Sequence, residues 1–338
     1  MPKSDVLRAI RRHRLSGWVG FVLLGVVVPP LTSSEYYKHL EVLVMIYLLL
    51  ILGMHLLSGI AGQVSFGQSA FMGIGAYAGG LTLVHTNIPY VLGALVAIGF
   101  SAVVALILGP VLVKLLGDYF VIATIALVEV VYLVLLNSVS LTGGPLGLSG
   151  IPQPGLAGKN ITTDTQFYYL VFVINVIVMV AVLNISQSRV GRGLTSIRDD
   201  ELAAGTFGVR VRYYKVVVLA TSAGLAGLSG LLFASFSAYL NPVSFDYNQG
   251  VTFAIIVIVG GLGSLPGAVL ATVLVTLSPE LLRSLGDWRL TIYGAVLAAM
   301  MVTRPQGLLG RRTQTQRRRS LRNWRRTAPS AIDPGLPV

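Results

Sequence analysis

The sequence predicts an all-α polytopic membrane protein with about eight to ten transmembrane helices. Its 338 residues are 54% hydrophobic and only 11% charged, whereas a soluble domain carries about 25% charged residues. Residues 42–113 contain no Asp, Glu, Lys or Arg, and residues 216–279 contain only Asp246. Because a helix needs about 20 mostly apolar residues to cross a bilayer, each of these two runs is long enough for more than one span.

Ten apolar segments are predicted to span the membrane. They lie at residues 18–31, 41–58, 64–84, 89–113, 119–138, 167–185, 216–238, 249–263, 266–283 and 288–303. The first segment follows a basic flank, as in a signal peptide, but no small-x-small cleavage site comes after it, so we expect a retained span. The pair 249–263 and 266–283 is joined by GGLGSLPG, which fits either a cytoplasmic turn or a break within one membrane-embedded segment.

The distribution of Lys and Arg predicts the orientation. Of the 25 such residues, 21 fall in residues 1–17, in residues 185–215, at Lys114 and in the C-terminal tail, and four fall on the opposite side. Cytoplasmic loops of membrane proteins carry an excess of Lys and Arg, so both termini are expected in the cytoplasm. The chain then has a cytoplasmic basic N-terminus, a transmembrane domain at 18–303 and a disordered basic tail at 304–338 that anionic lipid attracts.

A charged segment interrupts the apolar pattern between the sixth and seventh predicted spans. The stretch GRGLTSIRDDELAAGTFGVRVRYYK covers residues 191–215, and its signals predict a short cytoplasmic helix at 196–207. Ser196 can cap the amino end, and Gly208 fits the position just past the last turn. Acidic side chains suit the helix dipole in the first turn, and here they are Asp199, Asp200 and Glu201.

The apolar residues of this predicted helix leave two interpretations open. Leu202, Ala203 and Phe207 can form a small apolar face, because positions three or four apart align on a helix. The helix is then either an interfacial element that merely connects two spans or a docking helix that a soluble partner holds. The basic residues that follow Gly208 are expected to anchor the next span at the inner headgroups.

Polar residues inside the predicted spans mark two further candidate sites. Glu129 is the one acid predicted deep inside a span, where a charge usually faces a cavity or finds a partner; it either lines a path or is a structural hydrogen-bonding group. Polar groups at membrane depth need partners or water, so a helix break in SGIAGQVSFGQSAF would line a path, with tight packing as the alternative. Its polar residues are Ser58, Gln63, Ser65, Gln68 and Ser69.

Small residues spaced four apart predict close helix packing within residues 216–238. The pairs are Ala223 with Gly227 and Ala226 with Gly230. Such small-xxx-small patterns let helix backbones approach one another closely in a membrane.

Five stretches of the chain carry a family resemblance. They are GMHLLSGIAGQVSFGQSAFMGIGAYAGG, GDYFVIATIALVEV, LTGGPLGLSGIP, SRVGRGLTSIRDDELAAGTFGVRVRYYKVVVLATSAGLAGLSGLLFA and VIVGGLGSLPGAVLATVLVTLSPELLR. In order and spacing they resemble the permease subunits of bacterial ABC importers of the branched-chain amino-acid class, LivM type, over residues 45–310. The wider importer pattern EAA…G is altered, because Glu201-Leu202-Ala203-Ala204 has an extra residue and Gly205 stands inside the helix.

The resemblance implies an importer with a second, homologous permease subunit, two cytoplasmic ABC ATPases and a periplasmic substrate-binding protein. This chain would form one half of a channel in the bacterial inner membrane that moves branched-chain or other apolar amino acids inward. It would not itself be an enzyme, since ATP is hydrolysed on the partner chains. Segment 186–215 would couple to an ATPase through Ser196, Asp199, Asp200, Glu201, Ala203, Ala204, Phe207 and Gly208. The translocation path is expected at Gln63, Ser65, Gln68 and Glu129.

Other functions fit the residues less well. A urea or short-amide ABC permease has a similar sequence and stays open as the alternative. An ion-coupled carrier would need more intramembrane titratable groups or two repeated halves. An intramembrane serine protease is suggested by GLSG at 147–150 and 227–230, but all four His residues precede both copies.

No cofactor or metal is expected from the sequence. The chain has no cysteine and no HExxH motif, and GGLGSLPG lacks the Lys-Ser/Thr of a P-loop. The net charge of +12 lies mostly beside membrane spans, so it indicates the membrane surface and not a nucleic-acid partner.

Cysteine labelling tests the predicted orientation, because the chain contains no cysteine of its own. A membrane-impermeant thiol reagent is expected to label Thr206→Cys only in inside-out vesicles, and Ser149→Cys only from outside intact cells. Labelling of position 206 from the exterior would overturn the orientation and every role that depends on it.

Overall fold

The computed structural model describes most of the predicted membrane domain. The described residues are 34–86, 88–115, 117–156, 159–161 and 163–281, together with Gly25, Trp288, Gly294, Ala295 and 307–309. The predicted spans 18–31 and 288–303 and the basic terminal regions 1–17 and 304–338 therefore lie almost wholly outside them.

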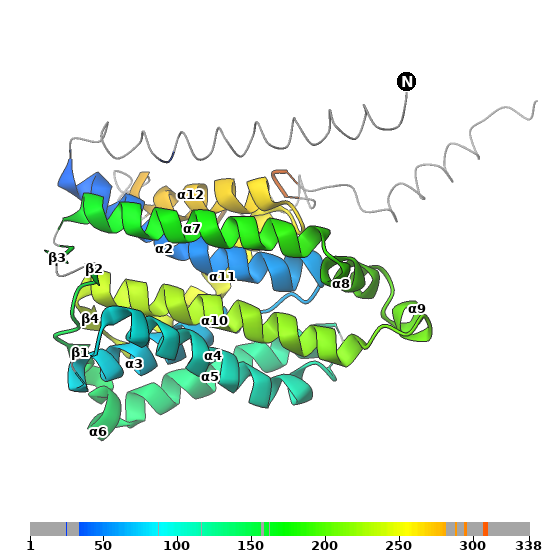
Figure 1. Cartoon of the computed structure of the whole chain (residues 1–338), viewed down its shortest axis with the longest axis horizontal. Helices are drawn as coiled ribbons and strands as arrows, with labels where there is room; N and C mark the ends of the chain where they lie inside the picture. The colour runs from blue at the N-terminus through cyan, green and yellow to red at the C-terminus, as the bar shows by residue number, and fades with distance from the viewer. Residues whose placement is uncertain are drawn as a thin grey trace, which may run out of the picture.

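Long helices make up the described chain, and Figure 1 shows them running side by side. They are α2 (Glu35–Met54), which continues as the π-helix η1 (His55–Ile60), α3 (Gln68–His85), α4 (Tyr90–Leu112), α5 (Asp118–Asn137), α7 (Asp164–Gln187), α10 (Val211–Ser237), α11 (Tyr247–Gly260) and α12 (Leu265–Leu281). Each of the eight predicted spans in the described part coincides with one of these helices. Six helical segments in this part are long and apolar enough to cross a membrane, whereas α3 and the 17-residue α12 fall short. The predicted all-α polytopic fold is confirmed.

Short elements close the two ends of the bundle. At one end, here called the α8 end, lie α8 (Arg189–Asp199) and α9 (Glu201–Thr206). At the other, the strand end, β1 (Leu148–Ser149) pairs antiparallel with β4 (Tyr239–Leu240), with Leu148 opposite Leu240. The remaining elements are α6 (Val139–Thr142), η2 (Gly144–Leu146), β2 (Gly155–Leu156), β3 (Lys159–Asn160) and η3 (Pro242–Phe245).

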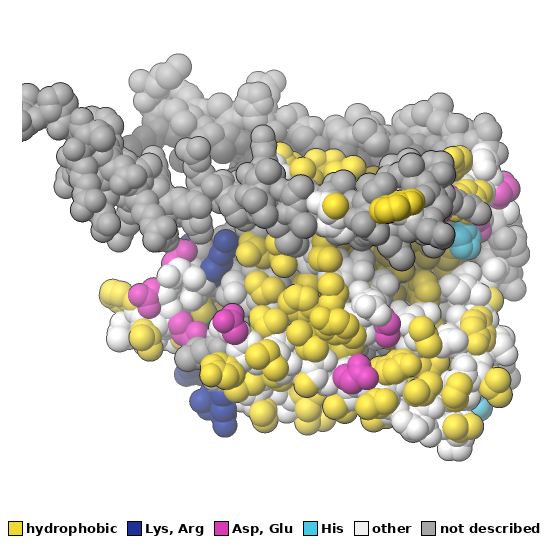
Figure 2. Space-filling view, turned by 180° about the vertical axis from the view of Figure 1, so that it is seen from behind, with side chains coloured by type: hydrophobic (Ala, Val, Ile, Leu, Met, Phe, Trp, Pro, Cys, Tyr) yellow, Lys and Arg dark blue, Asp and Glu magenta, His cyan; other side chains and the backbone are white. Residues whose placement is uncertain are grey.

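The core of the bundle is built around α2 and α10. In the most apolar window of each span, 78% of the residues of Glu35–Ile60 and 72% of those of Val211–Ser237 are buried, against 22% in α4 and in α5. The outer faces of α4, α5 and α7 carry exposed Val, Leu, Ile and Phe side chains, as expected of surfaces that meet lipid. Figure 2 shows part of this apolar surface, with Lys and Arg side chains gathered at the α8 end.

Glycines bring α10 into close contact with α3. A Cβ placed on Gly75 would lie 2.1 Å from the Cα of Gly227, and one placed on Gly230 would lie 2.0 Å from the carbonyl oxygen of Met72. Neither position has room for a side chain, so the predicted packing role of the small-residue pattern in α10 is confirmed. Gly227 also leaves room for Ser101 of α4, whose hydroxyl would lie 2.3 Å from a Cβ there and donates a 3.1 Å hydrogen bond to the carbonyl of Phe71 in α3.

Buried polar side chains connect α2 to its neighbours. Asn175 of α7 donates to the carbonyl oxygen of Met45 at 2.9 Å, and Ser229 of α10 donates to that of Ile46 at 2.8 Å. Because such bonds form away from water, they are specific cross-links between helices that are otherwise apolar.

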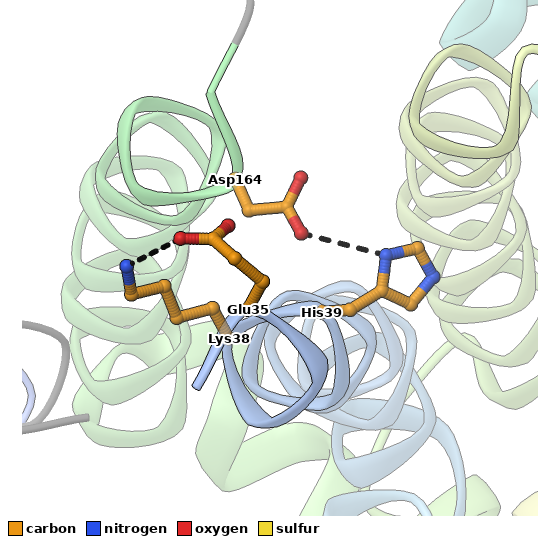
Figure 3. Close-up of polar contacts among 4 residues, drawn as sticks. All are labelled: Glu35, Lys38, His39 and Asp164. Carbon is orange, nitrogen blue, oxygen red and sulfur yellow. Dashed lines mark hydrogen bonds and ion pairs between the residues drawn. The ribbon is translucent and has the colours of Figure 1, made fainter. Parts of the chain in front are cut away.

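Charged side chains join α2 and α7 at the strand end, as Figure 3 shows. The Nδ1 atom of His39 lies 3.5 Å from Oδ2 of Asp164, and Nζ of Lys38 lies 2.9 Å from Oε1 of Glu35. The imidazole of His39 also packs on Phe236 of α10, with ring centroids 4.4 Å apart. Both contacts are partly solvent-accessible, so they contribute little to stability. Only the contact between His39 and Asp164 links α2 to α7, because Lys38 and Glu35 both belong to α2.

The glycine contacts lead to a stability prediction. Gly230→Ala is expected to lower the free energy of unfolding by about 1–3 kcal/mol, because the added methyl group overpacks the α10–α3 contact. Gly99→Ala in α4 is the matched control, since a Cβ there meets nothing within 4 Å. Thermal unfolding of the detergent-solubilised proteins compares them; equal midpoints for the two variants would contradict the packing assignment.

Candidate functional site

A tight turn carries the chain from α7 into α8. The hydroxyl of Ser188 caps α8 by accepting a 3.3 Å hydrogen bond from the backbone N–H of Gly191. A Cβ on Gly191 would lie 2.3 Å from the carbonyl oxygen of Ile185, so this turn requires glycine. From there α8 buries Leu194 and Ile197 against the bundle.

The charged segment forms two helices, and the prediction of a single helix at 196–207 is wrong in its bounds. Ser196 is not a cap: it lies within α8, where its hydroxyl donates to the carbonyl of Gly193 at 2.7 Å. The chain is extended at Asp200 (φ −161°, ψ 109°), which caps α9 by accepting a 3.0 Å hydrogen bond from the N–H of Ala203. The helix starts earlier than predicted because packing of α8 on the bundle outweighs the poor helix propensity of its two glycines.

The carboxyl end of this segment agrees with the prediction. Gly208 follows Phe207, the carboxyl cap of α9, and has a φ of +82°, the left-handed conformation that favours glycine just past a helix end.

Two large apolar side chains of α9 face away from the rest of the chain. Leu202 is 85% exposed and Phe207 is 88% exposed, whereas Ala204 is buried. Leu202 and Phe207 of the predicted apolar face therefore turn outward, whereas Ala203 is half-buried. α9 itself lies beyond the ends of the long helices (Figure 1). Asp199 and Asp200 are exposed beside them, so this end of the molecule displays apolar and acidic groups together.

Glu201 has a different environment from the other two acids. Its carboxylate lies 2.5 Å from Nζ of Lys215 in the first turns of α10, and the Lys215 side chain is only 6% exposed. Losing one partner of such a buried pair is costly, because the other charge is left without compensation. Glu201 therefore holds α9 against α10 and is not free to bind a partner through the same oxygen.

The predicted break in the glycine-rich early block is present. Residues 61–67, between η1 and α3, are not helical. The N–H of Phe66 donates to Oγ1 of Thr124 in α5 at 3.1 Å, and Nε2 of Gln68 donates to the hydroxyl of Ser222 in α10 at 3.0 Å. Ser222 lies about 17 Å along α10 at 1.5 Å per residue, so the break is well inside the bundle.

Several polar atoms at the break have no hydrogen-bond partner among the described residues. They are Oε1 of Gln63, Oε1 of Gln68 and Oγ of Ser69, and all three side chains are buried. An unsatisfied buried polar atom costs about 1–3 kcal/mol, and non-helical backbone at membrane depth occurs where it is buried in protein or lines a water-filled cavity. The break can therefore bind water or a small solute through hydrogen bonds. In the described part of the chain, no group of three or more His, Asp or Glu side chains could hold a metal ion.

The tentative path residues separate into two places. Gln63, Ser65 and Gln68 gather at the break, but Glu129 does not join them. Glu129 is the twelfth of the 20 residues of α5 and is exposed. It lies five positions after Thr124 and so about 140° around the helix from the side chain that reaches the break. Thr124 and Ser222 were not singled out from the sequence, although Thr124 is an isolated polar residue in an apolar run and Ser222 belongs to a Thr221–Ser222 pair in another.

Comparison with known proteins relates this chain to membrane transport proteins. Residues 37–303 match the family model described as "Branched-chain amino acid transport system / permease component". The chain is 31% identical over 315 residues to the high-affinity branched-chain amino acid transport system permease protein LivM of Escherichia coli (strain K12), covering 85% of this chain and 73% of LivM. It is 23% identical over 184 residues to LivH of the same strain, covering 52% of this chain and 59% of LivH. No solved structure matches it. The chain belongs to the permease-component family of branched-chain amino acid transport systems and is a multi-pass protein of the inner membrane.

Proposed function

We propose that this chain is the membrane-spanning permease subunit of an ABC importer that moves branched-chain or other apolar amino acids into the cell. ATP is hydrolysed on separate ATPase subunits, and a periplasmic binding protein delivers the substrate. The family membership and the likeness to LivM and LivH support this function. The observation that carries it is the α8–α9 pair, which stands outside the bundle and displays exposed apolar side chains.

In this proposal, α8 and α9 are the contact with an ATPase subunit. The excess of Lys and Arg on this side of the chain supports a cytoplasmic position for the pair. Leu202 and Phe207 have the exposure expected of anchors that insert into a partner's groove, and Asp199 and Asp200 add charge at the rim. An interfacial helix would instead bury its apolar face in the bilayer, whereas α9 is reached only after a kink that carries it beyond the spans.

The other predicted coupling residues have supporting roles in the proposal. Asp200 also caps α9, and Glu201 holds it to Lys215. The small Ala204 permits close packing of α9 on the bundle, with Ala203 half-buried beside it. Ser196 and Gly208 shape the two ends of the segment, Ser196 by bonding within α8 and Gly208 by turning the chain toward α10.

The substrate path in this proposal runs past the break at residues 61–67. The unsatisfied oxygen atoms of Gln63 and Gln68 support this placement, because they can accept hydrogen bonds from a passing ammonium group or from water. Phe71, whose N–H donates to the carbonyl of Gly67 at the end of the break, is fully buried, and such an apolar neighbour suits an apolar amino-acid side chain.

Glu129 lies on an exposed face of α5. We propose that this face contacts the second permease subunit or lines the aqueous path beside it. Its neighbours Ala126, Val130 and Leu133 are exposed in this chain, so without a partner a carboxylate would face hydrocarbon. Intramembrane charges usually face a bundle interior or a water-filled cavity. A homologous partner of the LivH kind would supply that environment.

Reconstitution tests the function and the docking site together. The chain, the second permease, the ATPases and the binding protein are placed in liposomes, where leucine is expected to stimulate ATP hydrolysis and to be taken up. The double variant Leu202→Ser with Phe207→Ser is expected to reduce co-purification of the ATPases about ten-fold, since it removes two anchor side chains. Leu146→Ser, which changes an 83% exposed leucine at the strand end, is the control. Absence of stimulation in the wild type would refute the function, and full ATPase recovery with the double variant would refute the docking site.

Substitution of Glu129 tests the assignment of its face. Glu129→Gln keeps hydrogen bonding and is expected to retain most leucine uptake, whereas Glu129→Leu is expected to reduce uptake about ten-fold by closing a polar surface to water. Membrane levels of both variants, measured by immunoblot, serve as the control. Normal uptake by both variants would remove Glu129 from the mechanism.

A further inference from the structure

Arg198 connects the last turn of α8 to the interior of the bundle. Its Nη1 atom donates a 2.5 Å hydrogen bond to the carbonyl oxygen of Gly59 in η1, 139 residues earlier in the chain. The side chain is half-buried, and among the described residues it forms no ion pair with a carboxylate. The contact is therefore a charge-assisted bond from the cytoplasmic segment to the end of α2 and η1.

Two glycine turns leave the space that this side chain occupies. A Cβ on Gly62 would lie 2.7 Å from Cγ of Arg198, and a Cβ on Gly263 would lie 2.7 Å from its Nη1. Both glycines have positive φ values, +75° and +87°, so both turns depend on glycine for their backbone conformation as well. Arg198 thus lies between the turn that opens the break and the turn that joins α11 to α12.

Both turns are connected to the break. Gly59 precedes the non-helical residues 61–67 and Gly62 is one of them, whereas the turn at Gly263 follows α11. Farther along α11, a Cβ on Gly250 would lie 2.7 Å from the carbonyl oxygen of Phe66 and 2.8 Å from the hydroxyl of Ser69. A displacement of the Gly59–Gly62 turn would therefore move the break directly, and a displacement of the Gly263 turn would act on it through α11.

The opposite side of the α11–α12 turn is held by another part of the chain. The backbone N–H of Leu308 donates to the carbonyl oxygen of Val259 at 2.7 Å. The α11–α12 turn therefore contacts both a C-terminal segment and the side chain of Arg198.

We infer that Arg198 is a positioning residue that transmits movement of the α8–α9 pair to the break at residues 61–67. This inference rests on the proposed function, because it assigns the movement to an ATPase that holds α9. When α8 shifts, the guanidinium carries the Gly59–Gly62 turn and the Gly263 turn with it, and the break opens or closes toward the α8 end. The planar guanidinium has five N–H donors, so it can change carbonyl partners without leaving this site.

The first test measures uptake per ATP hydrolysed in liposomes that contain the complete importer. In Arg198→Gln, the ATPases are expected to co-purify as in the wild type and to hydrolyse ATP, while leucine uptake per ATP falls about ten-fold. Arg198→Lys keeps the charge but replaces the planar five-donor guanidinium by an ammonium group with three N–H donors, and its ratio is expected between the two. Arg192→Gln is the matched control, since Arg192 is an exposed arginine of the same helix that bonds only to the carbonyl of Gln187 in the described chain; its ratio is expected to stay at the wild-type value.

The second test observes the break itself and does not depend on transport. The chain has no cysteine, so Val64→Cys supplies a single thiol within residues 61–67. Its labelling rate in the complete importer is expected to change when ATP and vanadate trap the closed ATPases, and Arg198→Gln is expected to abolish that change.

The two proposals fail in different ways. A wild-type complex that neither retains ATPases nor takes up leucine refutes the proposed function. Wild-type transport together with an unchanged uptake ratio in Arg198→Gln, or with nucleotide-dependent labelling that survives in Arg198→Gln, refutes only the role of Arg198. Loss of ATPase co-purification in Arg198→Gln also refutes it, because Arg198 would then be part of the docking surface.

Discussion

Hydrocarbon offers no hydrogen bonds to the protein backbone, and most of this structure follows from that constraint. The long helices satisfy their own N–H and C=O groups, and the few polar side chains within them bond to carbonyls of neighbouring helices, as Asn175 and Ser229 do to α2. Where the helix stops at residues 61–67, other helices must supply the missing partners. The hydroxyl of Thr124 in α5 accepts a hydrogen bond from the N–H of Phe66 and donates one within its own helix. Ser222 of α10 accepts one from Gln68. The non-helical conformation of residues 61–67 therefore depends on packing against α5 and α10.

Small residues make these cross-links possible. The glycines of α3 and α10 bring the two backbones into contact, and Gly227 of α10 also leaves room for the hydroxyl of Ser101 in α4, which bonds to a carbonyl of α3. Attraction between apolar helices is weak in lipid, so close packing and buried hydrogen bonds have to hold the bundle together. The same glycines that fix the core also leave room, at Gly62 and Gly263, for a side chain from outside it.

The charged segment divides its residues between two tasks. Leu194, Ile197, Arg198 and Glu201 face inward and attach α8 and α9 to the bundle, through apolar packing, a carbonyl contact and the pair with Lys215. Leu202 and Phe207 face outward, together with Asp199 and Asp200. A force applied to the outward group would reach the membrane helices through the inward group, because the two groups share two short helices that are each capped by a side chain, Ser188 and Asp200.

By itself, the sequence determined the eight long helices of the described part, their approximate ends, and the presence of a break and of a charged segment between two spans. The orientation implied by Lys and Arg stays a prediction. These properties depend on composition and periodicity within some 20 residues, which a linear reading can detect. Only the tertiary structure decided that Ser196 lies inside a helix, that Glu201 is paired with Lys215, that Glu129 points away from the break and that Arg198 reaches Gly59. Each of these depends on how α8, α9 and the spans pack, and the decisive partners are 14 residues away for Glu201 and 139 for Arg198. The intrinsic propensity of a short segment cannot predict such long-range contacts. The entropy lost when distant residues are brought together is offset by packing of the whole bundle and not by interactions within the segment.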